Sequence, residues 1–308
     1  MSNTERQLVK IIKEICCEKN IPLHTFSYDW ILQLNAPSKP IFIYGYQFQN
    51  NSATAQLITN DKSALSDILR ENHIPTVEHI FFRTPENMSY LGKNGNWKPM
   101  LALLEKHGTL VLKPNDGTGG NHVYKVATLP ELENAVFSIL QSNLSLSVSP
   151  FYEIESEYRV IVLDHSVELI YKKEIPYLTG DGEKSLYNLC LEKYENTSLL
   201  FGLQKPLDFV LPIGETLSLE WKHNLGKGAS AKIIKDEKIQ RELSELALSA
   251  AKLLDIHFSS IDIIQTNGRF KILEINSGIM MESFSMQSKE NYLTAKAIYE
   301  KALNALLD

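Results

Sequence analysis

The segment LVLKPNDGTGGNHVYKV, residues 110–126, constrains the fold more than any other part of the chain. An apolar, β-branched stretch delivers Lys113, and a turn rich in Gly, Asn and Asp separates it from a second apolar stretch. Gly117, Gly119 and Gly120 remove side chains where the backbone must come close to another group. Exposed N–H groups in such a loop form a concave anion site, and the lysine adds a charge for phosphate. The segment predicts a glycine flap over a nucleoside triphosphate, with an ordinary hairpin turn as the alternative.

The glycine pattern argues against three familiar nucleotide-binding motifs. The chain contains no G-x-x-x-x-G-K-[ST], so the flap is not a Walker loop. The H-R-D and D-F-G motifs of protein kinases do not follow it. A dinucleotide fingerprint needs its glycines between a strand and a helix, whereas these glycines lie between two strand-like stretches.

Composition narrows the class of protein further. The chain has 308 residues, 44% of them hydrophobic and 22% charged, which is typical of an ordinary globular protein. The net charge of −6 argues against a nucleic-acid partner. Cys16, Cys17 and Cys190 form neither a disulfide framework nor a metal-binding spacing, which favours a reducing compartment. No apolar run approaches the ~20 residues that cross a bilayer, so we expect a cytoplasmic protein without a membrane partner.

Hydrophobic periodicity and turn residues predict an irregular mixture of helices and strands. This mixture favours an α+β fold with antiparallel sheets. Strands are expected at 31–34, 41–44, 158–163, 167–173, 259–265 and 269–276, with a loop at 47–54. Helices are expected around Leu8–Cys16, 59–74, 130–141, 236–254 and 289–307. The predicted domains are a short N-terminal α/β subdomain at 1–58, a central subdomain with the flap at 59–147 and a C-terminal subdomain at 148–308.

Acidic and amide side chains gather on the last predicted hairpin. Glu274 and Asn276 are two residues apart and therefore share one face of their strand. Asp262 joins them if the hairpin loop has an odd number of residues, whereas a two-residue turn of Asn267 and Gly268 would place it on the other face. Two carboxylates and an amide oxygen suit Mg²⁺. A polar sheet face in solvent is the alternative reading.

A third charged cluster precedes the strand at 158–163. Glu153, Glu155, Glu157 and Arg159 alternate along this segment. Glu157 has the chemistry to accept hydrogen bonds from both hydroxyls of a ribose. Taken alone, the cluster fits solvated surface charges better than a binding site.

These motifs, in this order, resemble the ATP-grasp superfamily. The similarity covers roughly residues 58–283, and the chain looks most like the C-terminal part of the ATP-grasp region of cyanophycin synthetases, like bacterial glutathione synthetases and like peptide-type amino-acid ligases. The matching pieces are NDK at 60–62, LVLKPNDGTGG at 110–120, EYRVIVL at 157–163, TGDGEKSLYNL at 179–189, HNLGKG at 223–228 and SSIDII…KILEINSG at 259–278.

The resemblance implies an ATP-grasp fold in which ATP is held between two α+β subdomains. It also implies an ATP-dependent carboxylate–amine ligase that works through an acyl-phosphate and uses Mg²⁺, with Mn²⁺ as an alternative. Carried over by position, it assigns Lys62 and Lys113 to the phosphates, Gly119 and Gly120 to the flap, Glu157 to the ribose, Ser149 to Glu153 to the adenine pocket, Asn224 to the reacting phosphate, and Asp262, Glu274 and Asn276 to the metal.

The sequence departs from the family where relatives carry arginines. Lys222 stands at one such position and keeps the charge without the planar fork, and Glu174 stands at another. Because Lys172 is two residues from Glu174, it shares a strand face with it and is predicted to supply the missing charge. Lys222 and Arg159 are the other candidate cations.

The expected partners are a small-molecule carboxylate and an amine, either an amino acid or a peptide. A homodimer stays open, because dimers are common in the resembling families. Two other functions remain as alternatives: phosphoryl transfer without amide formation, and a non-catalytic nucleotide-binding module.

Overall fold

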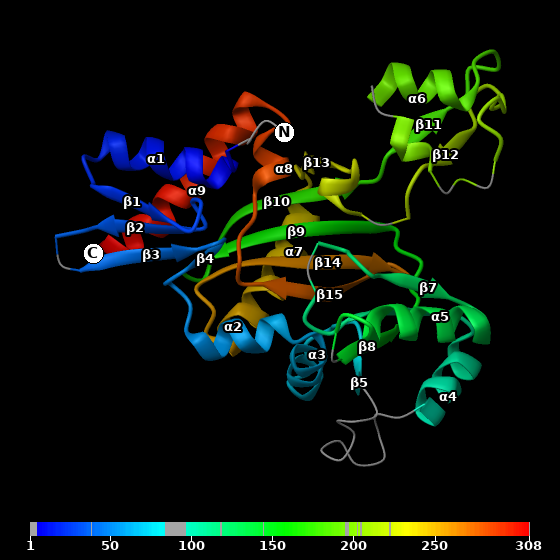
Figure 1. Cartoon of the computed structure of the whole chain (residues 1–308), viewed down its shortest axis with the longest axis horizontal. Helices are drawn as coiled ribbons and strands as arrows, with labels where there is room; N and C mark the ends of the chain where they lie inside the picture. The colour runs from blue at the N-terminus through cyan, green and yellow to red at the C-terminus, as the bar shows by residue number, and fades with distance from the viewer. Residues whose placement is uncertain are drawn as a thin grey trace.

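The computed structural model describes residues 5–37, 39–83, 97–117, 119–143, 145–194, 197–201, 203, 205–221 and 223–307. Its strands form four sheets, and every pairing between them is antiparallel. Helices flank the sheets without a repeating strand–helix order, which confirms the α+β class (Figure 1). Within these ranges, no helix has the length and apolar character needed to cross a bilayer.

The N-terminal unit combines one helix with a four-stranded sheet. The helix, α1 (Gln7–Glu18), buries the apolar residues that predicted it and packs against the C-terminal helix α9 (Lys289–Leu307). Figure 1 shows these two helices, blue and red, side by side. The strands pair in chain order: β1 (Leu23–Phe26), β2 (Ile31–Asn35), β3 (Pro40–Tyr44) and β4 (Gln47–Phe48). The two that the sequence predicted, β2 and β3, are confirmed.

The prediction of a loop over residues 47–54 is wrong at both ends of that range. β4 takes its first two residues, and α2 (Ala53–Asn60) begins before it ends. The hydroxyl of Ser52 caps α2 by accepting a hydrogen bond from the N–H of Ala55 (3.1 Å). The next helix, α3 (Lys62–Glu71), is capped by Asp61, whose carboxylate accepts from the N–H of Ala64 (2.9 Å).

A five-stranded sheet forms the centre of the molecule, in the order β13-β10-β9-β14-β15. One face packs on α7 (Glu237–Leu254), which lies behind the sheet in Figure 1. On the other face, the ends of the strands carry most of the charged residues predicted for the site. The strands are β9 (Ser156–Leu163), β10 (Ser166–Glu174), β13 (Ser230–Ile233), β14 (Phe258–Thr266) and β15 (Arg269–Asn276).

A second four-stranded sheet, in the order β5-β8-β6-β7, faces the central one across the site. It carries the flap between β6 and β7 and packs on α4 (Trp97–His107) and α5 (Leu129–Leu140). A capping box between Thr128 and Glu131 begins α5. The strands are β5 (Ile80–Arg83), β6 (Leu110–Pro114), β7 (Tyr124–Val126) and β8 (Ser145–Pro150).

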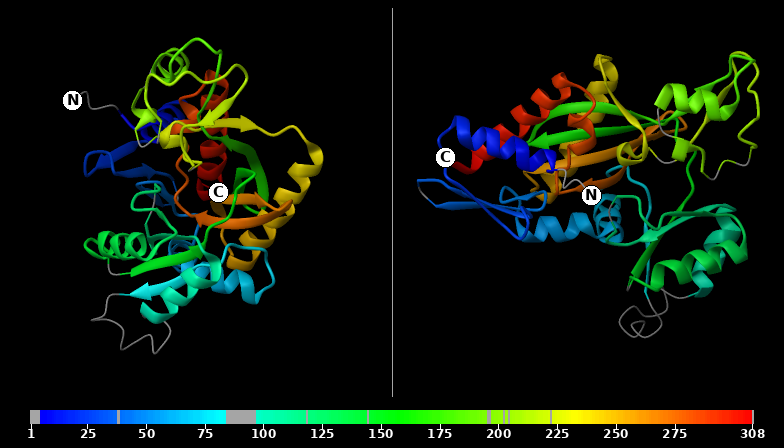
Figure 2. Two further views of the ribbon diagram at one scale, coloured as in Figure 1. Left: turned by 90° about the vertical axis from the view of Figure 1, so that its right-hand side faces the viewer. Right: turned by 45° about the horizontal axis from the view of Figure 1, so that its top comes forward.

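A small lobe inserts between β10 and β13 and has an apolar core of its own. Both views of Figure 2 show it projecting from the central sheet. It contains β11 (Tyr177–Thr179), α6 (Leu186–Tyr194), the 3₁₀ turn η2 (Thr197–Leu200) and β12 (Thr216–Ser218). The 3₁₀ turn η3 (Leu225–Lys227) and the short helix α8 (Glu282–Ser285) complete the described elements.

The predicted domain boundaries fall inside secondary-structure elements. The one after residue 58 lies within α2, and the one after residue 147 lies within β8. The division of the chain at 58 and 147 stays a prediction.

Candidate functional site

A cavity of about 810 Å³ lies where the central sheet, the flap sheet and the N-terminal unit meet. This volume is in the range of pockets for small-molecule ligands. Its lining includes nearly every sequence-predicted site residue that the structure describes: Lys62, Lys113, Gly119, Gly120, Glu157, Arg159, Asn224, Asp262, Glu274 and Asn276. Residues more than 200 positions apart in the sequence therefore share one cavity.

The hairpin of β14 and β15 places Asp262 opposite Glu274, but not in the way that the sequence suggested. The turn has two residues, Asn267 and Gly268, both with positive φ (48° and 68°). Thr266 pairs with Arg269, and the regular ladder would then put Asp262 opposite Leu273. A β-bulge after the Ile263–Ile272 pair shifts the register by one residue. We expected a two-residue turn to put Asp262 and Glu274 on opposite faces of the sheet, and this expectation is wrong. The bulge adds one residue to β15, which returns the two carboxylates to the same face.

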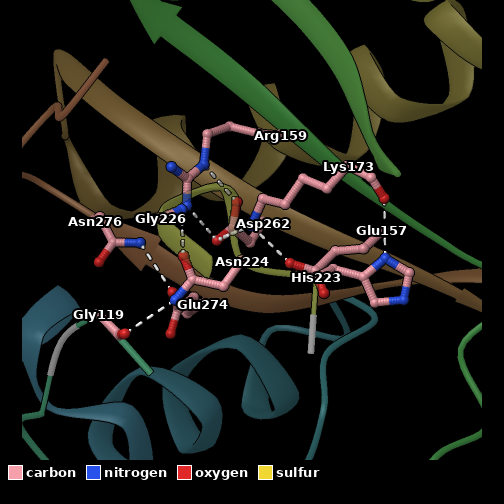
Figure 3. A network of polar contacts seen from close by, with 10 residues as sticks. All are labelled: Gly119, Glu157, Arg159, Lys173, His223, Asn224, Gly226, Asp262, Glu274 and Asn276. Atoms are coloured by element: carbon pink, nitrogen blue, oxygen red, sulfur yellow. Dashed lines mark hydrogen bonds and ion pairs between the residues drawn. The ribbon is translucent and has the colours of Figure 1, made fainter. Parts of the chain in front are cut away.

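The predicted metal ligands lie on one side of the sheet (Figure 3). The side-chain amide of Asn276 donates to Oε1 of Glu274 (3.2 Å), and Asp262 lies opposite Glu274 on the neighbouring strand. The described residues contain no group of three or more His, Cys, Asp or Glu placed to hold a metal, so the set depends on the amide of Asn276. Its hard oxygens fit Mg²⁺, which needs few protein ligands when phosphate and water complete its shell.

Asp262 is at the centre of a buried ion network. Arg159 donates to both of its oxygens through Nε and Nη2, each at 2.7 Å, and Lys173 lies 2.8 Å from Oδ2. Burial by itself raises the pKa of Asp262, but the charges of Arg159 and Lys173 outweigh it and hold that pKa well below its usual value. A carboxylate has about four lone-pair positions, so one oxygen keeps a position for a metal after these three contacts.

The same network engages Glu157. Lys173 donates to its carboxylate at 2.6 Å, and both side chains are buried. Burial raises the pKa of Glu157 in spite of the charge of Lys173. His223, which the sequence did not single out, donates through Nδ1 to the backbone oxygen of Lys173 (2.9 Å) and so lies over the same strand (Figure 3).

The prediction that Lys172 supplies a cation to the site is wrong, because its side chain does not line the cavity. Lys172 pairs with Tyr158, whose side chain packs toward α7, whereas Lys173 pairs with Glu157 and lines the cavity. The reason is a second bulge, at Glu168, without which Lys172 would be opposite Glu157. Glu174 also points away from the cavity, toward Lys232 (3.4 Å).

Lys62 and Lys113 mark the opposite wall of the cavity, next to the flap. Burial lowers the pKa of both ammonium groups, that of Lys113 to about 8, although the charge of Glu274 opposes the shift. Lys62 donates to the backbone oxygens of Asn115 (3.3 Å) and Gly117 and thereby ties the base of the flap to α3. Asn115 adds a second tie, because its side chain accepts from the hydroxyl of Ser63 (2.7 Å).

Asn224 holds the tip of the flap. Its side chain donates to the backbone oxygen of Gly119 (2.9 Å) and accepts from the N–H of Gly226 (2.9 Å), as Figure 3 shows. Gly119 and Gly120 have φ of 71° and 69°, and a Cβ on Gly120 would lie 3.1 Å from the Asn224 amide. Glycine is therefore required at this tip. The predicted cation Lys222 lies outside the described residues.

The predicted adenine-binding segment lines the cavity only in part. Ser149, Pro150, Phe151 and Tyr152 line it, whereas Glu153 is exposed and does not. Ile154, just beyond the predicted segment, adds to the same wall. The ammonium of Lys125 lies 3.7 Å from the centre of the Phe151 ring. An apolar, aromatic wall of this kind suits a planar base.

One family model matches the part of the chain that contains Asp262 and Glu274. Residues 214–300 match the model of the RimK-like ATP-grasp domain. The glutathione biosynthesis bifunctional protein GshAB of Clostridium perfringens is 25% identical over 281 residues, which cover 84% of this chain. The chain spans 35% of the length of that relative.

Two solved structures resemble the fold. A bifunctional glutathione synthetase from Pasteurella multocida superimposes with a TM-score of 0.58 at 14% identity, over 95% of this chain and 44% of that one. A D-alanine–D-alanine ligase from Bacillus anthracis gives a TM-score of 0.54 at 16% identity, over 82% and 70% of the two chains. At these identities the similarity concerns the fold.

Proposed function

We propose that this chain, a member of the ATP-grasp superfamily, is an ATP-dependent carboxylate–amine ligase. The observation that carries the proposal is the convergence of two charge types on one cavity. Lys62 and Lys113 lie beside the flap on one wall, and Glu274 and Asn276 lie on the central sheet. A polyphosphate needs cations and backbone N–H groups, and its Mg²⁺ needs hard oxygens.

The proposed reaction has two steps. A carboxylate oxygen of the first substrate attacks the γ-phosphorus of ATP, and the bond to the β-phosphate oxygen breaks to release ADP. The amine of the second substrate then attacks the carbonyl carbon of the acyl-phosphate, phosphate leaves with the bonding electrons, and the nitrogen loses a proton. Such phosphoryl transfer depends on positioning and charge neutralisation more than on covalent catalysis by the protein.

Different side chains along the cavity would bind the different parts of ATP. Lys62 and Lys113 would hold the phosphates under the flap, and the wall of Phe151, Tyr152 and Ile154 would hold the adenine. Glu157 keeps its proposed contact with the ribose through lone pairs that Lys173 leaves free.

Glu274 and Asn276, with the remaining position on Asp262, would hold Mg²⁺. The bound ion would neutralise charge on the transferring phosphoryl group. Mn²⁺, with the same preference for oxygen, is the proposed substitute.

Arg159 and Lys173 are the proposed cations for the acyl-phosphate. Both line the cavity on the Asp262 side, and Asn224 lies between them and the flap. Their fixed contacts with Asp262 hold both cations in place before a substrate arrives. A flap that closes over this end would exclude water, to which an acyl-phosphate is otherwise lost.

The test of the proposal is a product analysis with the full chain. The chain is incubated with Mg²⁺, ATP and pairs drawn from a panel of amino acids and dipeptides, and ADP, phosphate and new amides are measured. We expect all three in equal amounts, and only when both a carboxylate and an amine are present. A phosphorylated product without an amide would identify a phosphotransferase. ATP binding without ADP release across the panel would identify a non-catalytic module.

The lowered pKa of Lys113 predicts that nucleotide binding is accompanied by proton uptake. Since burial lowers the pKa of Lys113 to about 8, part of the population carries a neutral Lys113 near pH 8, and a bound phosphate would restore the charge by raising that pKa. Nucleotide binding should therefore take up about half a proton at Lys113 at pH 8 and less than about a tenth at pH 6.5. Calorimetry in buffers of different ionisation enthalpy measures this uptake.

The matched variant is Lys113→Met, which keeps most of the length of the side chain and removes the charge. The uptake is the difference between the two proteins, so protonation of the nucleotide itself cancels. Loss of a charge-assisted contact of ~1.5–3 kcal/mol should also weaken nucleotide binding about tenfold or more. Equal uptake and equal affinity in the two proteins would remove Lys113 from the phosphate site.

A further inference from the structure

The cavity extends past the acidic residues to a wall that the reaction as described does not use. This aromatic wall consists of Trp30, Tyr44, Tyr46 and Met280, and three of its members expose large apolar surfaces: Trp30 is 42%, Tyr44 60% and Met280 48% exposed. A contiguous patch of exposed apolar side chains is a more specific sign of a binding site than single exposed residues are. Because Trp30, Tyr44 and Met280 line one cavity together, they offer a contiguous apolar surface to a ligand.

The aromatic wall lies beside the reacting end of the cavity. Gln47 forms a β-bridge with Gly278, two residues after Asn276. The N–H of Ile279 donates to the backbone oxygen of Tyr46 (3.1 Å). The turn that carries the wall is thus hydrogen-bonded to the segment that follows the proposed metal ligands, whereas the proposed adenine wall comes from the segment after β8.

The wall is fixed before any ligand binds. The guanidinium of Arg6 lies over the rings of Trp30 and Tyr46, 4.8 and 5.2 Å from their centres, and donates to the backbone oxygen of Gly45 (3.0 Å). Gly45 has a φ of 61°, and a Cβ there would lie 2.7 Å from the Trp30 ring. The indole therefore packs directly on the backbone, which leaves it little freedom to move.

No described side chain that lines this end of the cavity, in segments 30–47 and 277–284, is charged. The nearby guanidinium of Arg6 is engaged by two aromatic rings and by the backbone oxygens of Gly45 and Asp29. Glu282 is close by, but its carboxylate is engaged by the hydroxyl of Tyr46 and by the N–H groups of Gln7 (2.6 Å) and Leu8 (3.1 Å). A charged side chain placed here would lose its water without gaining a partner.

We infer that the aromatic wall is a specificity subsite that selects an amino-acid substrate with a large, uncharged, apolar side chain. The inference rests on the proposed ligase function and adds a substrate class to it. Aromatic and aliphatic side chains bury area against Trp30 and Tyr44, while acidic and basic side chains are rejected by the cost of desolvation.

The test is the binding of single amino acids to the full chain saturated with Mg²⁺ and a non-hydrolysable ATP analogue. L-phenylalanine, L-alanine and L-glutamate are titrated in turn by calorimetry. We expect phenylalanine to bind about ten to a hundred times more tightly than alanine, and glutamate no more tightly than alanine. Equal affinities, a preference for glutamate or no binding of phenylalanine would overturn the inference without the use of any variant.

Two variants locate the preference. Trp30→Ala should bring phenylalanine to within about threefold of alanine, because the ring loses its largest contact surface. Phe42→Ala is the control, since Phe42 is an exposed aromatic of the same sheet (37%) that does not line the cavity, and the preference should persist. A preference that survives Trp30→Ala would contradict the subsite. The affinity of each variant for the nucleotide analogue reports whether it is folded.

The outcomes also separate this inference from the proposed function. Selective binding of phenylalanine without ADP release under any condition would refute the ligase and keep the subsite. Amide formation that favours alanine or glutamate over phenylalanine would keep the ligase and refute the subsite.

Discussion

Turnover should fall at least about a hundredfold when Glu274 is replaced by glutamine, because a preorganised electrostatic contact to a transition state typically contributes ~10²–10³ in rate. Glu274→Gln keeps the shape of the side chain and removes the charge that would hold Mg²⁺. The fold should survive, since Glu274 is only half-buried and the side-chain oxygen of glutamine can still accept the hydrogen bond from the Asn276 amide. ADP release measures the loss, and urea denaturation should show a free energy of unfolding within about 1 kcal/mol of the parent.

Glu153→Gln is the matched control. It makes the same chemical change on the segment that precedes β9, at an exposed position outside the cavity. Its turnover should equal that of the parent. If Glu274→Gln turned over at the parental rate across a range of Mg²⁺ concentrations, the metal site would have to be sought elsewhere.

The free energy of unfolding should fall by about 3–5 kcal/mol when Asp262 is replaced by alanine, because removing one partner leaves buried charges uncompensated. Arg159 loses both of its hydrogen bonds to the carboxylate, and Lys173 keeps only Glu157. Urea denaturation monitored by tryptophan fluorescence gives the difference. Asp164→Ala, which breaks an exposed contact with His257 (3.1 Å), should cost less than about 1 kcal/mol.

The contribution of Asp262 to the free energy of unfolding should depend on pH. Its pKa is lower in the folded chain than in the unfolded one, where it is about 3.9, so the carboxylate stabilises the fold above that value. The difference between the parent and Asp262→Ala should be constant from about pH 5 to pH 8 and shrink as the pH falls below about 4. A difference that instead grew toward acid would show that Asp262 is not the anion of an ion network.

The sequence predicted four of the five described strands of the central sheet, without β13, but not the faces that their residues share. Both hairpins were found from their turn residues and apolar strands, and the helix at α7 from its periodicity. Each hairpin then contains one bulge, at Glu168 and at Leu273, and each bulge moves every later residue to the opposite face. Alternation cannot locate such an extra residue, because strand sequences on either side of it look regular.

The sequence predicted those residues of the candidate site that belong to a recognisable motif. Lys62, Lys113, Asp262, Glu274 and Asn276 reach the cavity as expected. Lys173 replaces Lys172 because of the bulge at Glu168. The aromatic wall was missed, since Trp30 and Tyr44 lie in a segment without a motif, and only the tertiary contact between the turn at Gly45 and the segment after β15 brings them to the site.

The attachment of the N-terminal unit has a consequence for the order of folding. The caps that Glu282 provides for α1 join residues 275 and 274 positions apart, and α1 packs on α9. Closing so long a loop is entropically costly, so these contacts form late, whereas the hairpins of the central sheet are local. During folding, the nucleotide end of the cavity would therefore assemble before α8 and α9 fix the N-terminal unit and its aromatic wall. A folding chain would acquire the capacity to bind nucleotide before the capacity to choose its substrate.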